Sequence, residues 1–381
     1  MNQPVSSSPS KKMREYGAFA LLLTAAILLF WWRVWIPSAA DRMHFTDDIF
    51  IKDYPTRMGL FRQMLEGRAP LWDPYQFGGW PGLANCEAGL FYPFNWIVAF
   101  FCNAPEEAFQ ATQWLVLLHF FLVGMGTYRY SRYIGISGWG SAFAAIALTF
   151  CGFLCAHKKH TNMIFTLAWL PWLLLQAERW IRESQGRFLF RLTALLALAY
   201  FAGHPQSSLY LSLLIAARMI YGAAEKIQSR PMSIGERLRR GAAPIVIVFM
   251  LAGALTAIQY APTVELIQQG ERSQADVFQR SSEFSLPPSE MLEALFPEVL
   301  SSWSQTEVFY WGLAPLLLAL HFVLRGRLKA LDRYLIGVFV ISVLFSMGEY
   351  VFAYDLSYLL IPGAAWVRAP SRWIFFAGLP L

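Results

Sequence analysis

Charged residues are scarce in this chain. Only 15% of its 381 residues are Asp, Glu, Lys or Arg, whereas 56% are hydrophobic, and the mean hydropathy is +0.40. Soluble domains carry about 25% charged residues. Apolar runs long enough to cross about 30 Å of hydrocarbon recur along the sequence. The composition therefore excludes an ordinary soluble protein and predicts a polytopic membrane protein without soluble domains.

Cysteine is also scarce and carries no metal or redox signature. The four cysteines form no CxxC pair and no zinc-binding pattern. Cys151 and Cys155 lie on one face of an apolar helix and are expected in the core. Cys86 and Cys102 share one loop, and whether they form a disulfide stays open because sequence does not give the required geometry. The first apolar run lacks a cleavage site and is expected to be an anchor.

The apolar runs predict an all-α transmembrane bundle of about nine complete spans. These lie near 17–35, 108–128, 138–155, 162–179, 188–203, 206–222, 243–261, 309–324 and 334–350. A tenth begins at Trp373 and is cut short at Leu381, which is expected of the N-terminal part of a larger protein. Residues 1–16 are expected to form a cytoplasmic tail and residues 17–381 one transmembrane domain.

The basic residues assign an orientation to this bundle, because Lys and Arg gather in cytoplasmic loops. With nine spans, five basic clusters fall on one side of the membrane, and the HKKH stretch in the loop 156–161 is the one exception. The clusters are Lys11, Lys12 and Arg14; Arg129 and Arg132; Arg179, Arg182, Arg187 and Arg191; Lys226, Arg230, Arg237, Arg239 and Arg240; and Arg325, Arg327, Lys329 and Arg333. The N-terminus is therefore predicted to be cytoplasmic, and the net charge of +6 is explained without nucleic acid.

The remaining loops share the opposite, extracytoplasmic face and hold nearly all of the unusual chemistry. They are 36–107, 156–161, 203–206, 262–308 and 351–372. Acids on one loop and cations on others predict a site that handles an anion. The candidate substrate-binding residues are Lys52, Trp72, Tyr75, Glu87, Tyr92, His157, Lys158, Lys159, His160, His204, Gln206, Gln259, Glu265, Arg368 and Arg372.

The first of these loops opens with two adjacent aspartates, Asp47 and Asp48, just after the first span. Neighbouring carboxylates repel each other, more strongly near a low-dielectric surface. The pair is therefore either solvated or faces a cationic group. Further along the loop, residues 55–68 are expected to form a helix lying on the membrane. Its apolar face is Met58, Phe61, Met64 and Leu65, with Arg57, Arg62 and Arg68 on other faces.

Each feature also has a simpler interpretation. Lysines at the headgroup level often snorkel, and tryptophans such as Trp72 are typical of the interface belt. His157 and His160 are two ligands three residues apart, which is too little to define a metal site. A divalent metal is thus left without support, and no cofactor is assigned. His119 and His321 lie in apolar helices and are expected to be satisfied core histidines.

Two absences bear on the class of activity. The spans carry almost no acids or bases near mid-membrane, where ion-coupled transporters need them, and no inverted repeat is evident. Both argue against a lipid or polysaccharide transporter or flippase, which stays as one alternative. A non-catalytic membrane scaffold is the other. The chain also lacks P-loop and Rossmann fingerprints.

Seven segments occur in the order and spacing of the YfhO-type bacterial membrane proteins. They are DIFIKDYP, PLWDPYQFGGWPGLANCEAGLFYPFN, WLPWLL, GHPQSSLY, QYAPTVELI, SLPPSEMLEALFP and VRAPSRW. The chain resembles this family, which belongs with the C-type (GT-C) glycosyltransferases, over residues 16–381. The loop after Pro70 is the most specific part. Asp73 and Glu87 depart from the family, where Asn and Gln are frequent, which leaves the substrate open.

The resemblance implies an enzyme of the bacterial cytoplasmic membrane. It would move a sugar from a polyprenyl-phosphate carrier to an extracytoplasmic acceptor, namely a glycopolymer, lipid or protein of the cell envelope. The acidic residue of the first outer loop is the expected catalytic position. Asp48, seven residues before Pro55, matches it best, with Asp47 in support. Such a reaction needs a base for the acceptor hydroxyl and cations for the leaving phosphate, for which Lys158, Lys159, Arg368 and Arg372 are the candidates.

Overall fold

A computed structural model describes residues 9–36, 45, 49–101, 104–229, 233–237, 241–269, 277–294, 310–326, 328–361, 364 and 367–379. Within these ranges the chain is helical and forms no strand. One isolated bridge joins Asp73 to Trp80. The predicted all-α class is therefore confirmed.

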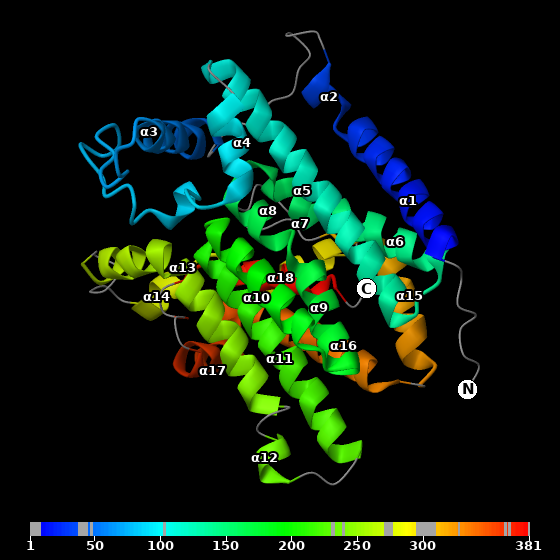
Figure 1. Cartoon of the computed structure of the whole chain (residues 1–381). Coiled ribbons are helices and arrows are strands. Elements are labelled where there is room, and N and C mark those ends of the chain that lie inside the picture. Colours follow the sequence, from blue (N-terminus) through cyan, green and yellow to red (C-terminus); the bar gives the residue numbers. More distant parts are fainter. Residues whose placement is uncertain are drawn as a thin grey trace.

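The bundle is built from helices that follow the predicted spans (Figure 1). The main helices are α1 (Pro9–Phe30), α5 (Pro105–Ile134), α6 (Gly138–Thr149), α9 (Leu170–Glu183), α10 (Gly186–Phe201), α11 (Pro205–Ser229), α13 (Ala243–Gln269), α15 (Leu313–Leu324) and α16 (Ala330–Ser346). Shorter helices connect them: α2 (Trp32–Trp35), α3 (Tyr54–Leu65), α4 (Pro93–Phe101), α7 (Gly152–Ala156), α8 (Thr161–Leu167), α12 (Ile234–Arg237), α14 (Val277–Ser281), α17 (Phe352–Leu360) and α18 (Ile374–Ala377). Single tight turns complete the described chain: η1 (Ile49–Asp53), η2 (Cys86–Ala88), η3 (His157–Lys159), η6 (Pro288–Ala294), η7 (Gly348–Tyr350) and η9 (Pro370–Trp373).

Five segments are long and apolar enough to cross a membrane. They are Ser10–Phe30, Glu106–Ile134, Gly138–Lys159, Pro205–Lys226 and Ala243–Gln269. The other predicted spans are also helical but shorter, and the one at 162–179 is divided between α8 and α9. The chain is thus a membrane protein with several apolar helices, while the count of nine spans and their orientation stay predictions. Helix α1 begins at Pro9, within the predicted cytoplasmic tail.

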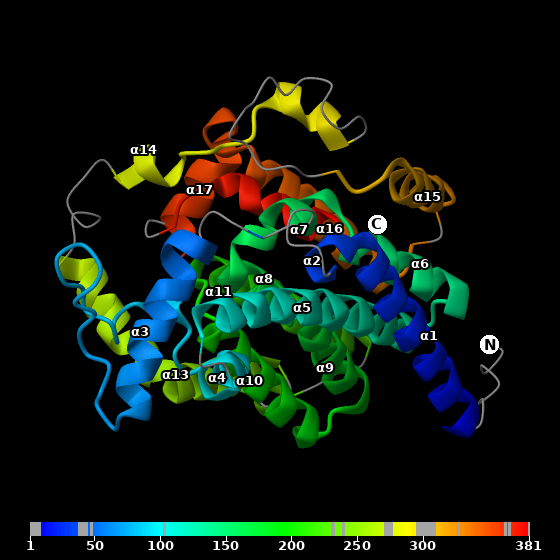
Figure 2. The ribbon, with the colours of Figure 1, turned by 90° about the horizontal axis from the view of Figure 1, so that it is seen from above.

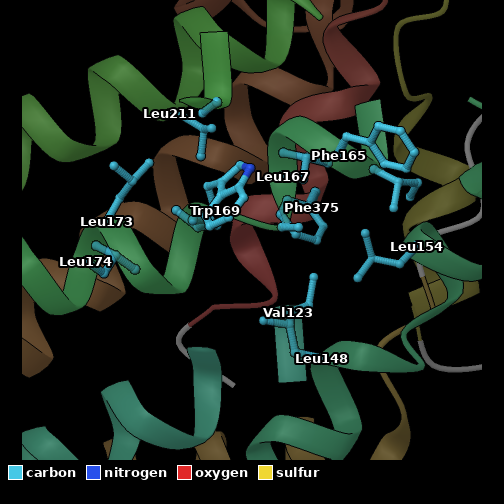
Figure 3. Packing of buried hydrophobic residues seen from close by; sticks show 14 of the residues in the cluster. Val123, Leu148, Leu154, Phe165, Leu167, Trp169, Leu173, Leu174, Leu211 and Phe375 are labelled. Carbon is cyan, nitrogen blue, oxygen red and sulfur yellow. The ribbon is translucent and has the colours of Figure 1, made fainter. Parts of the chain in front are cut away.

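The core lies where α5 to α9, α11 and α18 meet. Figure 3 shows their buried side chains converging, among them Val123, Leu148, Leu154, Phe165, Leu173, Leu211 and Phe375. The side chain of His119 is fully buried in this core, where its Nδ1 lies 2.6 Å from the carbonyl oxygen of Leu115. Its Nε2 lies 2.6 Å from the hydroxyl of Tyr92. The prediction of a satisfied core histidine is confirmed for His119, but it is wrong for His321, which is exposed on α15.

A buried ion pair joins α9 to α11. Arg218 Nε donates to Glu178 Oε2 at 3.0 Å, and each side chain is only 3% exposed. Arg182 Nε also donates to the same carboxylate, at 2.8 Å from Oε1. Glu178 and Arg218 stand near the ends of the predicted spans 162–179 and 206–222, so the expectation of almost no acids or bases near mid-membrane stays a prediction.

Helix α3 packs one side against the bundle. It lies beside α4 and α5 in both views (Figures 1 and 2). The buried residues of α3 are Thr56, Arg57, Leu60 and Phe61. Leu65, assigned to the apolar face, is 49% exposed. The placement of that apolar face on the membrane stays a prediction, whereas the burial of Arg57 was not predicted.

Candidate functional site

The predicted catalytic pair, Asp47 and Asp48, lies outside the described residues. The described chain resumes at Ile49, on the π-helical turn η1, and leads directly into α3. The site is therefore built from the groups that follow this pair and from the loops that meet them.

Lys52 and Glu87 meet across the first long loop. Lys52, on η1, forms an ion pair with Glu87, on the turn η2, and both side chains are partly exposed. Two predicted binding residues, 35 positions apart, are thus brought together. Their charges compensate each other, and the pair joins η1 to η2.

The GHPQ and VRAPSR segments also meet. Arg372 Nη1 donates to Oε1 of Gln206 at 2.8 Å. Gln206 Nε2 in turn donates to the carbonyl oxygen of Ala369 at 3.0 Å and also contacts that of Arg368. Ala369 has a φ of 57°, which is unfavourable for a residue with a side chain. Its amide donates to the carbonyl oxygen of Glu283 at 3.0 Å, so contacts on both sides hold this conformation.

His204 is buried within electrostatic reach of several predicted site residues. It is 7% exposed, and its Nδ1 accepts the backbone N–H of Ser207 at 3.1 Å, in the first turn of α11. Burial lowers the pKa of His204 well below its usual range, and nearby positive charge lowers it further. The groups responsible are Arg372, His160, His157 and Lys52. Three separate segments, namely the VRAPSR loop, the HKKH turn and η1, therefore act on one neutral imidazole.

The two histidines of the HKKH turn are themselves held close together. The ring of His157 stacks on Phe153 with centroids 4.1 Å apart, and its Nδ1 donates to the carbonyl oxygen of Phe153 at 2.7 Å. The rings of His157 and His160 lie 5.3 Å apart. Lys158 extends over the ring of Trp31, 5.7 Å from its centroid. Among the described residues, no group of three His, Cys, Asp or Glu side chains is placed to hold a metal ion.

A buried cluster of Asp53, Arg57 and Thr161 was not predicted as part of the site. Thr161 Oγ1 donates to Asp53 Oδ2 at 2.7 Å and accepts from Arg57 Nη2 at 2.8 Å. Arg57 also lies 3.9 Å from the same carboxylate and donates to the carbonyl oxygen of Ala88. Burial raises the pKa of Asp53, although Arg57 and Thr161 oppose that shift. The sequence signal for this cluster was the i, i+4 spacing of Asp53 and Arg57.

This cluster fixes the relative positions of three site segments. Asp53 follows Lys52, Thr161 follows His160, and Ala88 follows Glu87 in the chain. A hydrogen-bonded centre beneath them therefore joins η1, the HKKH turn and η2. Asp53, Arg57 and Thr161 thus hold the segments that carry Lys52, Glu87 and His160.

Helix α13 positions the loop that carries Glu87. Gln259 Nε2 donates to the carbonyl oxygen of Leu83 at 2.8 Å, and Thr263 Oγ1 donates to that of Ala84 at 2.9 Å. On the other side, a Cβ on Gly203, whose φ is +89°, would lie 2.3 Å from the carbonyl oxygen of Cys86. The predicted substrate residue Gln259 thus supports a loop, and glycine at 203 is needed for close approach of two backbones.

The structure separates several predicted residues from this cluster. Tyr92 is fully buried in the core, where it bonds His119 and accepts from Trp169 Nε1 at 3.1 Å, so its hydroxyl already has its partners. Arg368 is 54% exposed and pairs with Glu283 at 3.7 Å. Glu265 is exposed on α13. The exposed Trp72 and Tyr75 line a groove beside α3.

The cysteines follow their predicted environments in part. Cys86 is a buried free thiol, so it forms no disulfide with Cys102, which itself lies outside the described residues. Burial raises the pKa of the Cys86 thiol to about 12. Cys151 is buried in the core as expected, and Cys155 is half-buried.

An all-helical bundle with apolar spans and a polar, cation-rich cluster defines a polytopic membrane protein. The family model described as bacterial membrane protein YfhO matches residues 90–354, which is more than half of the chain. The protein therefore belongs to the YfhO family. The match includes the HKKH turn and Gln206 but begins after Glu87 and ends before Arg368. Comparisons with curated proteins and with solved structures found no match.

Proposed function

We propose that this protein is a membrane glycosyltransferase that moves a sugar from a polyprenyl-phosphate carrier to an extracytoplasmic acceptor of the bacterial cell envelope. Membership of the YfhO family, which is consistent with the GT-C superfamily, supports this class of activity. The acceptor is a glycopolymer, a lipid or a protein, and the active face lies outside the cytoplasm.

The observation that carries the proposal is the gathering of cations around His204. When the glycosidic bond to a polyprenyl phosphate breaks, negative charge grows on the departing phosphate. Arg372, Lys52 and the HKKH turn all contribute positive potential at His204. Because His204 is buried and neutral, it adds no charge of its own and can offer a ring nitrogen to a phosphate oxygen.

The base in this mechanism is Asp48. It removes the proton from the acceptor hydroxyl as the oxygen attacks the anomeric carbon and the phosphate leaves with the bonding electrons. Asp48 lies four residues before Lys52, whose partner is Glu87. Positive charge in this region favours the ionised form that a base requires. Asp47 either supports Asp48 through hydrogen bonds or faces solvent.

Substitution of the two aspartates tests this proposal. The complete protein in lipid bilayers is given a radiolabelled polyprenyl-phosphate sugar, and transfer and donor binding are measured separately. Asp48→Asn is expected to abolish transfer and to leave donor binding intact. Asp47→Asn is expected to lower the rate by about 10- to 100-fold, as loss of a supporting hydrogen bond does. Activity in Asp48→Asn would contradict the role of Asp48 as the base. Loss of activity in Asp47→Asn alone would assign that role to Asp47.

A lipid or polysaccharide transporter is a second candidate, favoured by one observation. The buried Glu178–Arg218 pair is the kind of intramembrane charge that transporters use. In that case the same bilayers would move labelled lipid between leaflets, and no sugar would be released from the donor. A non-catalytic scaffold would neither move lipid between leaflets nor release sugar from the donor.

A further inference from the structure

A groove of about 530 Å³ lies beside α3, outside the cation cluster. Helix α3 forms one wall, and the loop from Arg68 to Tyr75 forms the other. The groove is lined by Tyr54, Met58, Gly59, Arg62, Gln63, Arg68, Trp72, Pro74 and Tyr75. Its volume falls within the range of about 300–1,000 Å³ that is typical of small-molecule sites.

The aromatic wall of the groove is held in place by contacts within the loop. The ring of Trp72 lies against the backbone of Gly79, where a Cβ would come within 2.2 Å of the indole. Gly79 also has a φ of +125°, so no other residue fits there without strain. Gln63 Nε2 donates to the carbonyl oxygen of Trp72 at 3.0 Å, and the amide of Tyr75 donates to Asp73 Oδ1 at 3.0 Å.

The groove combines exposed aromatic faces with planar polar donors. Trp72 is 53% exposed and Tyr75 is 86% exposed. Arg62 is exposed on α3, and Arg68 is partly compensated by an ion pair with Glu66. A sugar ring has one face of C–H groups, which packs on an aromatic ring, and an edge of hydroxyls, which bonds to guanidinium and amide groups. This set of side chains matches a carbohydrate better than an alkyl chain.

The groove borders the segment that carries Lys52. Tyr54, one of the lining residues, directly follows the buried Asp53 and lies two positions after Lys52 in the chain. Gln76, just beyond the aromatic wall, donates to Thr56 on the first turn of α3. The wall is therefore joined to the segment that carries the site, and a chain bound in the groove would have one end near Lys52.

We propose that this groove is a carbohydrate-binding subsite that holds the glycan chain of the acceptor, an assignment that rests on the proposed transferase function. Sugar rings stack on Trp72 and Tyr75, and Arg62, Gln63 and Arg68 bind their hydroxyl or carboxylate groups. The acceptor is thereby a glycan and not a bare peptide or a simple lipid.

Oligosaccharide binding to the complete protein in nanodiscs tests the proposal without requiring catalysis. Maltoheptaose and tetragalacturonate serve as neutral and acidic probes, and binding is measured by saturation-transfer NMR. At least one probe is expected to bind the unsubstituted protein. Trp72→Ala and Arg62→Gln are each expected to weaken that binding at least tenfold. Phe77→Ala is the matched control, because Phe77 is 87% exposed on the same loop and does not line the groove.

Three outcomes would overturn the assignment: neither probe binds, Phe77→Ala weakens binding as much as Trp72→Ala, or a fluorophore on Tyr75→Cys is quenched by brominated lipid. The last would mean that the groove lies against the bilayer. Failure of the transferase proposal is distinguishable from these, since probe binding would persist without any transfer. Conversely, if Trp72→Ala transfers sugar with an unchanged acceptor KM, the glycan-binding role of the groove is rejected and the transferase proposal is retained.

Discussion

The guanidinium of Arg372 lies 2.8 Å from the amide oxygen of Gln206, although 166 residues separate the two in the chain. This hydrogen bond joins the VRAPSR loop to the first turn of α11 and places a fixed positive charge beside His204. The contact orients an arginine that the proposed reaction needs for its phosphate.

Replacing Arg372 by glutamine is expected to weaken binding of the polyprenyl-phosphate donor by about 10- to 100-fold. A hydrogen bond to a charged group contributes about 1.5–3 kcal/mol, and an arginine can hold phosphate through two N–H groups. Donor affinity of the purified protein in nanodiscs is the measurement. Arg333→Gln changes a fully exposed arginine on α16 and is the control. Unchanged donor affinity in Arg372→Gln would reject the phosphate role.

His204→Asn is expected to reduce the loss of stability in acid. Folded His204 stays neutral because burial lowers its pKa, whereas the unfolded chain is protonated below about pH 6.5. Unfolding therefore takes up a proton there, and His204 costs about 1.4 kcal/mol of stability per pH unit as the pH falls further. Above about pH 7, where both states are neutral, it contributes no pH dependence.

The experiment compares thermal unfolding from pH 8 to pH 4.5. Asparagine can still accept the backbone N–H of Ser207, as a helix N-cap commonly does. The variant should therefore match the unsubstituted protein at pH 8 and lose less stability in acid. His321→Asn, at an exposed position, controls for the loss of any histidine. Identical pH profiles for His204→Asn and the unsubstituted protein would contradict the buried neutral state.

Glu178→Gln is expected to destabilise the protein by about 3–5 kcal/mol, because it leaves the buried charge of Arg218 uncompensated. Arg218→Met is expected to cost less, because Arg182 still pairs with Glu178. The double variant should recover most of the loss, since neither charge then remains. Unfolding in detergent measures the free energies for this double-mutant cycle. Glu183→Gln breaks the more exposed pair with Arg187 and should cost at most about 1 kcal/mol. Additive losses in the double variant would show that the pair is not coupled.

Cysteine labelling is expected to place two exposed loops on opposite sides of the membrane. Ser289, on η6, and Ser233, before α12, are both exposed in the structure. In spheroplasts an impermeant maleimide should label Ser289→Cys, whereas Ser233→Cys should react only after the membrane is opened. The unsubstituted protein gives the background from its native cysteines. Labelling of both variants in intact spheroplasts would reject the predicted orientation.

Much of the fold could be predicted because helices in a membrane need long apolar runs, and those runs are local in sequence. The ends of the helices at Phe201, Leu324 and Ser346 lie close to the predicted ends of spans at 203, 324 and 350. The division of one predicted span between α8 and α9 was missed, because the apolar pattern continues through the turn at Ala168 and Trp169. Pro171, in the first turn of α9, was the signal for a new helix.

The candidate site was predicted in part for a similar reason. His204, Gln206 and Arg372 were selected because polar residues between apolar spans are conspicuous, and the structure brings them together. Tyr92 was selected in the same way, yet its hydroxyl serves the core. The type of a polar residue and its position along the chain do not show whether its side chain bonds to substrate or to another helix.

The sequence by itself determined the class of this protein: its low charge, its apolar periods and its ordered loop motifs specify an all-helical membrane protein of the YfhO family. Only the tertiary structure decided which charges are buried. Arg57 was assigned to the surface of a helix, and Arg218 drew no attention, yet both are enclosed. Burying an ion is unfavourable unless a partner lies within reach. Those partners, Asp53 with Thr161 for one and Glu178 for the other, are brought there by the packing of separate elements.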